Sequence, residues 1–158
     1  MIQRIQTLWL IAVLVIAVAT FFFPLAYLDI DIKGMSAKYE YSIYPMAKDT
    51  IFHPAWVLII LQSVLFIATL ITIFLYKNRM LQIKILAFLL LVCVVYTGYI
   101  FLFVIDNAAK DIPVGLFKTG DAYGIGSYFS FAQIVLIYLA QKAIKKDEIL
   151  VRSSDRLR

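Results

Sequence analysis

The stretch that decides the fold is Tyr76-Lys77-Asn78-Arg79-Met80-Leu81-Gln82-Ile83-Lys84, a short charged break between two long apolar runs. It carries the basic residues Lys77, Arg79 and Lys84 and no acidic residue. Short loops rich in Lys and Arg stay on the cytoplasmic side of a membrane. We therefore assign residues 77–84 to an inner loop, and this assignment orients every other segment of the chain.

The composition on either side of this loop is that of a membrane protein. Of the 158 residues, 63% are hydrophobic and 16% are charged, with a mean hydropathy of +0.90. Soluble domains are about 45–50% apolar. Since a helical span takes about 20 apolar residues, we expect a single all-α integral membrane domain over residues 1–158. The predicted four-transmembrane-helix bundle has spans near residues 5–25, 55–76, 85–105 and 124–141.

The charges follow this topology. The start of the chain, the inner loop and a C-terminal tail at 142–158 hold ten basic and three acidic residues, a net charge of +7. The predicted outer loops, 26–54 and 106–123, hold five basic and seven acidic residues, a net charge of −2, and together they give the net +5 of the chain. Such asymmetry is expected of a protein whose surroundings are a lipid bilayer and whose two termini are cytoplasmic. It does not require nucleic acid as a partner.

The first outer loop has a strand pattern. Apolar or aromatic residues alternate with charged or polar ones from Leu28 to Lys33 and again from Lys38 to Ile43, with Gly34 between the two runs. This period of two predicts a small extracytoplasmic β-hairpin between the first and second helices. The second outer loop contains Pro113 and Gly115 in a predicted turn, and we expect it to be an ordinary solvated connection.

Two patterns of small residues occur in the sequence, one in the first apolar run and one near the start of the last predicted span. Ala17-Val18-Ala19 has the form of a signal-peptide cleavage site, but the apolar run continues past it, so we expect a retained span.

Gly120 with Gly124, and Gly126 with Ser130, have the spacing that lets a second helix approach closely. That helix belongs either to this chain or to another copy, which leaves a homo-oligomer open.

Site chemistry is sparse in this sequence. We expect no ionisable residue deep within a span, where such residues mark ion pathways. His53 stands at a predicted membrane edge, and Cys93 lies in the middle of an apolar run. Neither has partners that suggest a nucleophile pair or a metal site. We therefore expect no catalytic residues, metal or cofactor, and a protein that is not an enzyme.

The tail predicts a charged helix. Glu148 and Arg152 are four residues apart, and Asp155 follows Arg152 by three, which are favourable spacings on a helix. Two interpretations remain: the helix lies on its own loop or on the lipid surface, or it docks a cytoplasmic or membrane partner. In the second, an accessory or scaffold subunit binds its partner through a basic cytoplasmic face. The candidate residues are Arg4, Lys77, Arg79, Lys84, Lys145, Lys146, Asp147, Glu148, Arg152, Asp155 and Arg156.

A second functional hypothesis concerns the outer half of the bundle. There, polar and aromatic residues interrupt the third and fourth spans, and they predict a carrier or sensor of a lipid or small apolar ligand held between helices. The candidate lining residues are Tyr96, Thr97, Tyr99, Tyr128 and Gln133.

Several segments together resemble a domain-of-unknown-function family of small four-span membrane proteins from Bacteroidota-type bacteria. They are the start Met1-Ile2-Gln3-Arg4-Ile5-Gln6, the exit Phe21-Phe22-Phe23-Pro24, the inner loop, the glycines near Tyr123, and the tail from Ala143 to Arg158. The likeness covers essentially the whole chain. It implies a multi-pass protein of the bacterial inner membrane and carries no activity with it.

Overall fold

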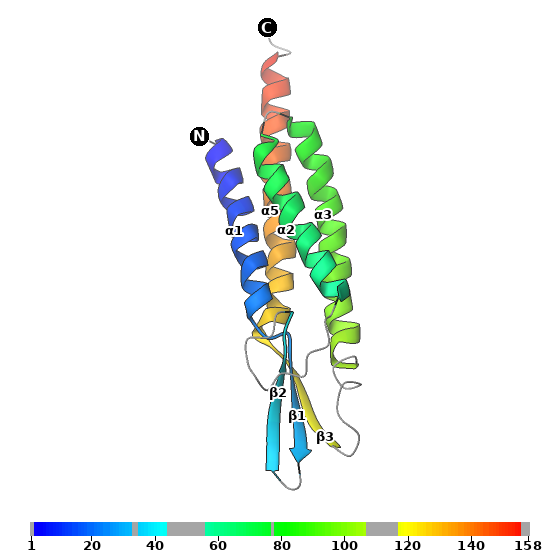
Figure 1. The fold of residues 1–158 in the computed structure, drawn as a ribbon. Coiled ribbons are helices and arrows are strands. Elements are labelled where there is room, and N and C mark those ends of the chain that lie inside the picture. Colours follow the sequence, from blue (N-terminus) through cyan, green and yellow to red (C-terminus); the bar gives the residue numbers. More distant parts are fainter. Residues whose placement is uncertain (1, 33–34, 44–55, 77, 107–116, 156–158) are drawn as a thin grey trace.

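A computed structural model describes residues 2–32, 35–43, 56–76, 78–106 and 117–155. Within these residues the chain forms four long helices and a small three-stranded sheet (Figure 1). Each predicted span overlaps one of the observed helices, but α3 begins before its predicted span and α5 continues through most of the predicted tail to Asp155. The elements are α1 (Ile2–Phe22), β1 (Ala26–Ile32), β2 (Met35–Tyr41), α2 (Trp56–Phe74), α3 (Arg79–Tyr99), η1 (Ile100–Val104), β3 (Phe117–Tyr123) and α5 (Ile125–Asp155).

Residues 79–84 were predicted as part of the inner loop, but α3 already begins at Arg79. Asn78 precedes the helix, and its carbonyl accepts hydrogen bonds from the backbone N–H groups of Leu81 and Gln82 at 3.0 Å each. The connection between α2 and α3 is therefore shorter than the charge pattern indicates. Arg79 and Lys84, which the charge pattern assigns to this loop, lie in α3 instead.

The four helices lie side by side, with the sheet at one end and both chain ends at the other (Figure 1). Each helix contacts two neighbours, in the order α1, α2, α3, α5 and back to α1. The first and last helices of the chain are thus adjacent. α3 continues into η1, a short π-helix next to the sheet end.

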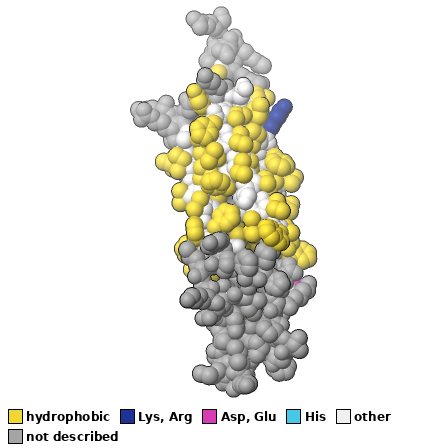
Figure 2. Space-filling model, in the orientation of Figure 1, with side chains coloured by type: hydrophobic (Ala, Val, Ile, Leu, Met, Phe, Trp, Pro, Cys, Tyr) yellow, Lys and Arg dark blue, Asp and Glu magenta, His cyan; other side chains and the backbone are white. Residues whose placement is uncertain are grey.

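Apolar side chains cover the outside of the helices. Trp56, Phe74 and Leu91 are 66%, 71% and 60% exposed, and Figure 2 shows hydrophobic side chains over most of the middle part of the visible face. Two helices, Trp56–Phe74 and Arg79–Val104, are long and apolar enough to cross a membrane, and Gln6–Phe22 is a shorter apolar helix. The most apolar stretches of the two long ones are only 28% and 39% buried within the protein. These helices therefore do not resemble the buried core helix of a soluble protein.

Glutamine side chains join each pair of neighbouring helices. Each uses its amide Nε2 as a hydrogen-bond donor to an oxygen of the next helix. The bonds run from Gln62 to the Ala17 carbonyl (3.0 Å), from Gln82 to the Thr72 carbonyl (2.8 Å), from Gln141 to the Ile83 carbonyl (3.3 Å), from Gln133 to Thr20 Oγ1 (3.3 Å) and from Gln6 to the Ala143 carbonyl (3.3 Å). The helical part thus buries hydrogen-bonded polar side chains among the apolar side chains of its core.

The predicted hairpin is present, as β1 and β2 pair antiparallel with Ala26 opposite Tyr41 and Ile32 opposite Met35. The prediction for the second loop was wrong in part, because residues 117–123 form β3 and pair with the other side of β1. Asp29 lies opposite Gly120 and Ile30 opposite Lys118, so the register shifts at this point and Thr119 is the extra residue of a bulge. The predicted turn at Pro113 and Gly115 lies outside the described residues, as does His53.

Glycines at the start of α5 contact the backbone of this chain just after α1. The N–H of Gly124 donates to the Leu25 carbonyl at 2.8 Å, and that of Gly126 to the Pro24 carbonyl at 3.0 Å. Gly126 and Ser130 lie on α5 as predicted. Gly120 lies in β3, however, so its spacing from Gly124 is not a helical one. The contact fixes the start of α5 against the end of α1, next to the sheet.

Candidate functional site

The end of the molecule that carries both termini brings together three segments distant in sequence: the start of α1, the connection from α2 to α3, and the last turns of α5. An ion pair joins two of them. Arg79 Nη1 lies 3.0 Å from Asp147 Oδ2, with the two side chains 28% and 13% exposed. The pair fixes α5 to the start of α3 at the point where α5 leaves the other helices.

The other candidate partner-binding residues are distributed around this pair. Lys84, Lys145 and Lys146 are exposed, and Glu148 is half-buried. Arg4, Arg152 and Asp155 lie in α1 and α5, where only the helical backbone is described. Lys77 and Arg156 lie outside the described residues. The structure thus places most of the candidate partner-binding residues at the end of the molecule that carries both termini. It brings Arg79 and Asp147 into direct contact.

An open groove of about 340 Å³ lies beside the ion pair. Its walls come from the start of α3 and from α5, and its lining residues are Asn78, Arg79, Met80, Glu148 and Val151. On α5 next to it, Ile149, Leu150 and Val151 are 67%, 48% and 39% exposed. The groove therefore combines both signs of charge with apolar side chains, on a helix that continues past its neighbours (Figure 1).

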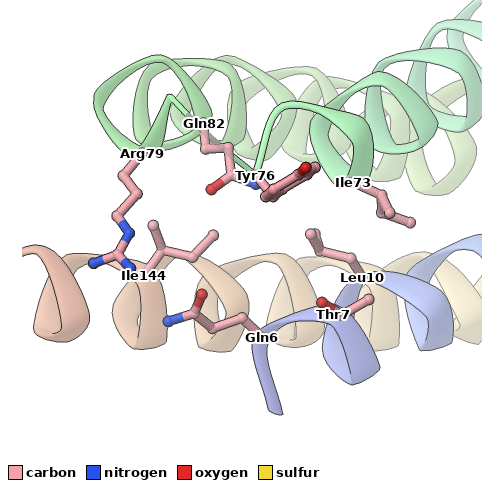
Figure 3. A pocket seen from close by; sticks show the side chains of 8 residues that line it. All are labelled: Gln6, Thr7, Leu10, Ile73, Tyr76, Arg79, Gln82 and Ile144. Atoms are coloured by element: carbon pink, nitrogen blue, oxygen red, sulfur yellow. The ribbon is translucent and has the colours of Figure 1, made fainter. Parts of the chain in front are cut away.

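A second, more enclosed pocket lies between the helices at the same end (Figure 3). It holds a volume of about 20 Å³, about that of one water molecule. Figure 3 shows Arg79 reaching from the start of α3 toward α5, with Gln6 on the opposite side and Leu10 and Ile73 further along the helices. The lining residues are Gln6, Thr7, Leu10, Ile73, Tyr76, Arg79, Gln82 and Ile144.

The residues predicted to line a ligand site are only partly together. Tyr96, Thr97 and Gln133 are buried between helices, whereas Tyr99 is half-buried and Tyr128 is 57% exposed. Thr97 Oγ1 donates to the Cys93 carbonyl at 2.8 Å, and Gln133 is bonded to Thr20. The Tyr96 hydroxyl is buried and has no hydrogen-bond partner within the part of the chain that the structure describes.

Sequence reasoning missed most of the polar interior. Gln6, Gln62, Gln82 and Gln141 join helices in the structure, and the first and third of them also line the enclosed pocket. The signal was present as glutamines within or beside apolar runs, which are costly in a membrane unless they are hydrogen-bonded. Among the described residues, no group of three or more His, Cys, Asp or Glu side chains is placed to hold a metal ion.

Comparison with known proteins gives one match. A family model described as "Domain of unknown function (DUF4293)" matches residues 2–157. No curated protein and no solved structure matches the chain.

Proposed function

The chain belongs to the DUF4293 family, and from that premise we propose that it is a four-span protein of the bacterial inner membrane that acts as a non-enzymatic docking subunit. Its termini and the connection between α2 and α3 are cytoplasmic, and its sheet lies on the other side. It binds a protein partner through the groove beside the Arg79–Asp147 pair and the projecting end of α5. The observation that carries this proposal is the continuity of α5 past its neighbours with apolar side chains exposed on it.

The distribution of polarity supports the membrane placement. The apolar side chains of Trp56, Phe74 and Leu91 are exposed, whereas the polar side chains of Gln62 and Gln133 are buried. In water this would reverse the usual arrangement of side chains. In lipid the arrangement is favourable, because apolar side chains face acyl chains and polar ones find partners inside. Positive charge at the end with both termini supports the orientation.

The length of α5 supports the docking role. Its 31 residues correspond to about 46 Å of helix at about 1.5 Å per residue, whereas the hydrocarbon core of a bilayer is about 30 Å thick. Several turns of α5 therefore extend into the cytoplasm. Because the helix continues without a break through residues 142–155, its end projects from the membrane instead of lying flat on the lipid surface.

The chemistry of this end defines the partner. Ile149, Leu150 and Val151 are exposed apolar residues at consecutive positions around α5, and the exposed cations Lys145 and Lys146 lie about one turn before them. A helix that packs into a groove does so through apolar residues on one face. We therefore expect the partner to contribute an amphipathic helix whose apolar face is flanked by acidic residues.

Photo-crosslinking at single positions tests the docking role. A photoreactive amino acid at Leu150 in native membranes is expected to crosslink one protein, and the same group at Leu8, an exposed residue of α1, is not. The protein identified is then purified, and its affinity for the intact chain is measured. The double variant Ile149→Gln, Leu150→Gln is expected to lower this affinity at least ten-fold.

Leu81→Gln is the matched control, because Leu81 is 44% exposed and does not line the groove. It is expected to leave the affinity unchanged. Equal affinities of the double variant and the intact chain would exclude docking through α5.

A second candidate function is favoured by Tyr96. In this alternative, a lipid or small ligand with one polar group binds between the helices of the sheet-side half and accepts a hydrogen bond from the Tyr96 hydroxyl. That hydroxyl has no partner among the described residues. Mass spectrometry of the purified protein is then expected to find a ligand that Tyr96→Phe loses. If the intact chain carries no such molecule, this alternative fails.

A further inference from the structure

We propose that the enclosed pocket of Figure 3 binds the phosphate of an anionic phospholipid, with Arg79 as its ligand. The site lies between α1, the end of α2, the start of α3 and α5. It is separate from the proposed partner groove, although Arg79 borders both. The inference rests on the proposed membrane placement but not on the docking role.

The position of the pocket matches the depth of a lipid headgroup. Tyr76 and Arg79 lie where α2 ends and α3 begins, and Gln6 lies in the second turn of α1. These helix ends form the boundary between the apolar belt and the charged end of the molecule. Basic pockets between helices on the cytoplasmic side of a membrane are suited to anionic lipid headgroups.

The lining of the pocket changes from polar to apolar along the helices. Arg79 and Gln6 lie toward the end with the termini, and Leu10 and Ile73 lie deeper (Figure 3). A phospholipid has the same order of groups, with its phosphate at the surface and its acyl chains below. Free phosphate would gain nothing from the apolar part, so the lining favours a lipid.

Arg79 retains hydrogen-bonding capacity toward a phosphate. A guanidinium group has five N–H donors. Its Nη1 lies 3.0 Å from Asp147 Oδ2 in an ion pair, yet among the described residues this buried nitrogen has no partner with hydrogen-bond geometry. Arg79 also stands at the first position of α3, whose first turn contains no acidic residue. The positive end of the helix dipole therefore adds to the charge of its side chain.

Asp147 is the competing anion in this site. Its carboxylate neutralises Arg79 in the absence of lipid, and a phosphate that binds Arg79 must act against it. With about 20 Å³ available, the pocket takes one phosphate oxygen, and the rest of the headgroup lies at its mouth. Leu8 and Phe74, which are 62% and 71% exposed, provide apolar surface on α1 and α2 for acyl chains.

Native mass spectrometry of the full chain with defined lipids tests the inference. The protein is titrated with phosphatidylglycerol and with phosphatidylcholine in detergent. The intact chain is expected to bind phosphatidylglycerol more tightly. Arg79→Gln is expected to lower that affinity about five-fold, which corresponds to about 1 kcal/mol for one basic residue near the membrane surface.

Two further variants separate lipid binding from structural effects. Lys142→Gln removes an exposed charge of α5 that lines neither pocket, and it is expected to leave the affinity unchanged. Asp147→Asn removes the competing carboxylate and is expected to raise the affinity for phosphatidylglycerol. If the ion pair has only a structural role, Asp147→Asn lowers the affinity or leaves it unchanged, and the inference is wrong.

The remaining outcomes distinguish the possible sources of the anion. Competition by inorganic phosphate at millimolar concentration would identify a free-anion site instead of a lipid site. Equal affinities for the two lipids, or for Arg79→Gln and the intact chain, would overturn the inference and leave the membrane placement standing. Release of the protein from membranes by alkaline carbonate would instead overturn the membrane placement itself.

Discussion

Gly126 lies where two backbones meet. A Cβ atom built at this position falls 2.7 Å from the Phe23 carbonyl oxygen and 2.9 Å from that of Pro24, distances that no side chain can accept without movement of α1 or α5. We expect Gly126→Ala to lower the free energy of unfolding by about 1–3 kcal/mol, as overpacking does. Thermal denaturation in detergent measures the effect.

Gly98 supplies the matched control for this substitution. A Cβ atom there meets nothing within 4 Å, and Gly98 lies inside α3, where alanine is the better helix former. We expect Gly98→Ala to leave the stability unchanged or to raise it by up to about 1 kcal/mol. If the two variants lose the same free energy of unfolding, the close backbone contact at Gly126 is not the cause of the loss.

At the scale of elements, Gln133 is the most connected of the glutamines. It donates to Thr20 on α1 at 3.3 Å, and its Oε1 accepts from the Cys93 thiol on α3 at 3.8 Å. We expect Gln133→Leu to destabilise the protein by about 1–2 kcal/mol, since a hydrogen bond between helices in a membrane contributes about 0.6 and at most about 1.7 kcal/mol. Gln141→Leu, which removes one half-exposed bond, is expected to cost less. Reversible unfolding in mixed micelles compares the two variants.

The sheet shows what local sequence predicts and what it does not. The alternation from Leu28 to Lys33 predicts the hairpin, because strand pairing across a short turn depends on residues close in sequence. β3 has no such pattern, as Gly120 and the charged Lys118 and Asp121 interrupt it. Its strand conformation comes from pairing with β1, about 90 residues earlier, which only the arrangement of the helices brings about.

The sequence likewise predicts only part of the candidate site. Charge alone placed Arg79 and Asp147 on one surface, and the structure adds that they form an ion pair. The pocket behind them was not predicted, because its other lining residues are ordinary members of apolar runs. Gln6, Leu10 and Ile73 acquire a common surface only when α1 and α2 pack together.

For the whole molecule, the decisive prediction concerns its orientation across the membrane. The native Cys93 is fully buried, so reagents that label exposed thiols do not reach it in the folded protein. Ser153→Cys and Ala122→Cys place single exposed thiols at opposite ends of the molecule. We expect a membrane-impermeant maleimide added to intact spheroplasts to label position 122 and to leave position 153 unlabelled.

Inverted membrane vesicles are expected to give the reverse result, with label at position 153 alone. If both positions are labelled from the same side, they lie on one side of the membrane, and the proposed crossing by α5 between them is wrong. Labelling of position 153 alone in intact spheroplasts would show that the charge asymmetry does not determine the orientation.

The adjacency of α1 and α5 has a consequence for how the protein is made. The side chains of Gln6 on α1 and Cys93 on α3 find hydrogen-bond acceptors on α5, which is the last of the four helices to leave the ribosome. β1 likewise obtains its second neighbour only from the segment just before α5. Until then, these groups lack the partners that they have in the folded protein. A translation product that stops before β3 and α5 therefore leaves β1 with one strand neighbour and leaves Gln6 and Cys93 without these acceptors.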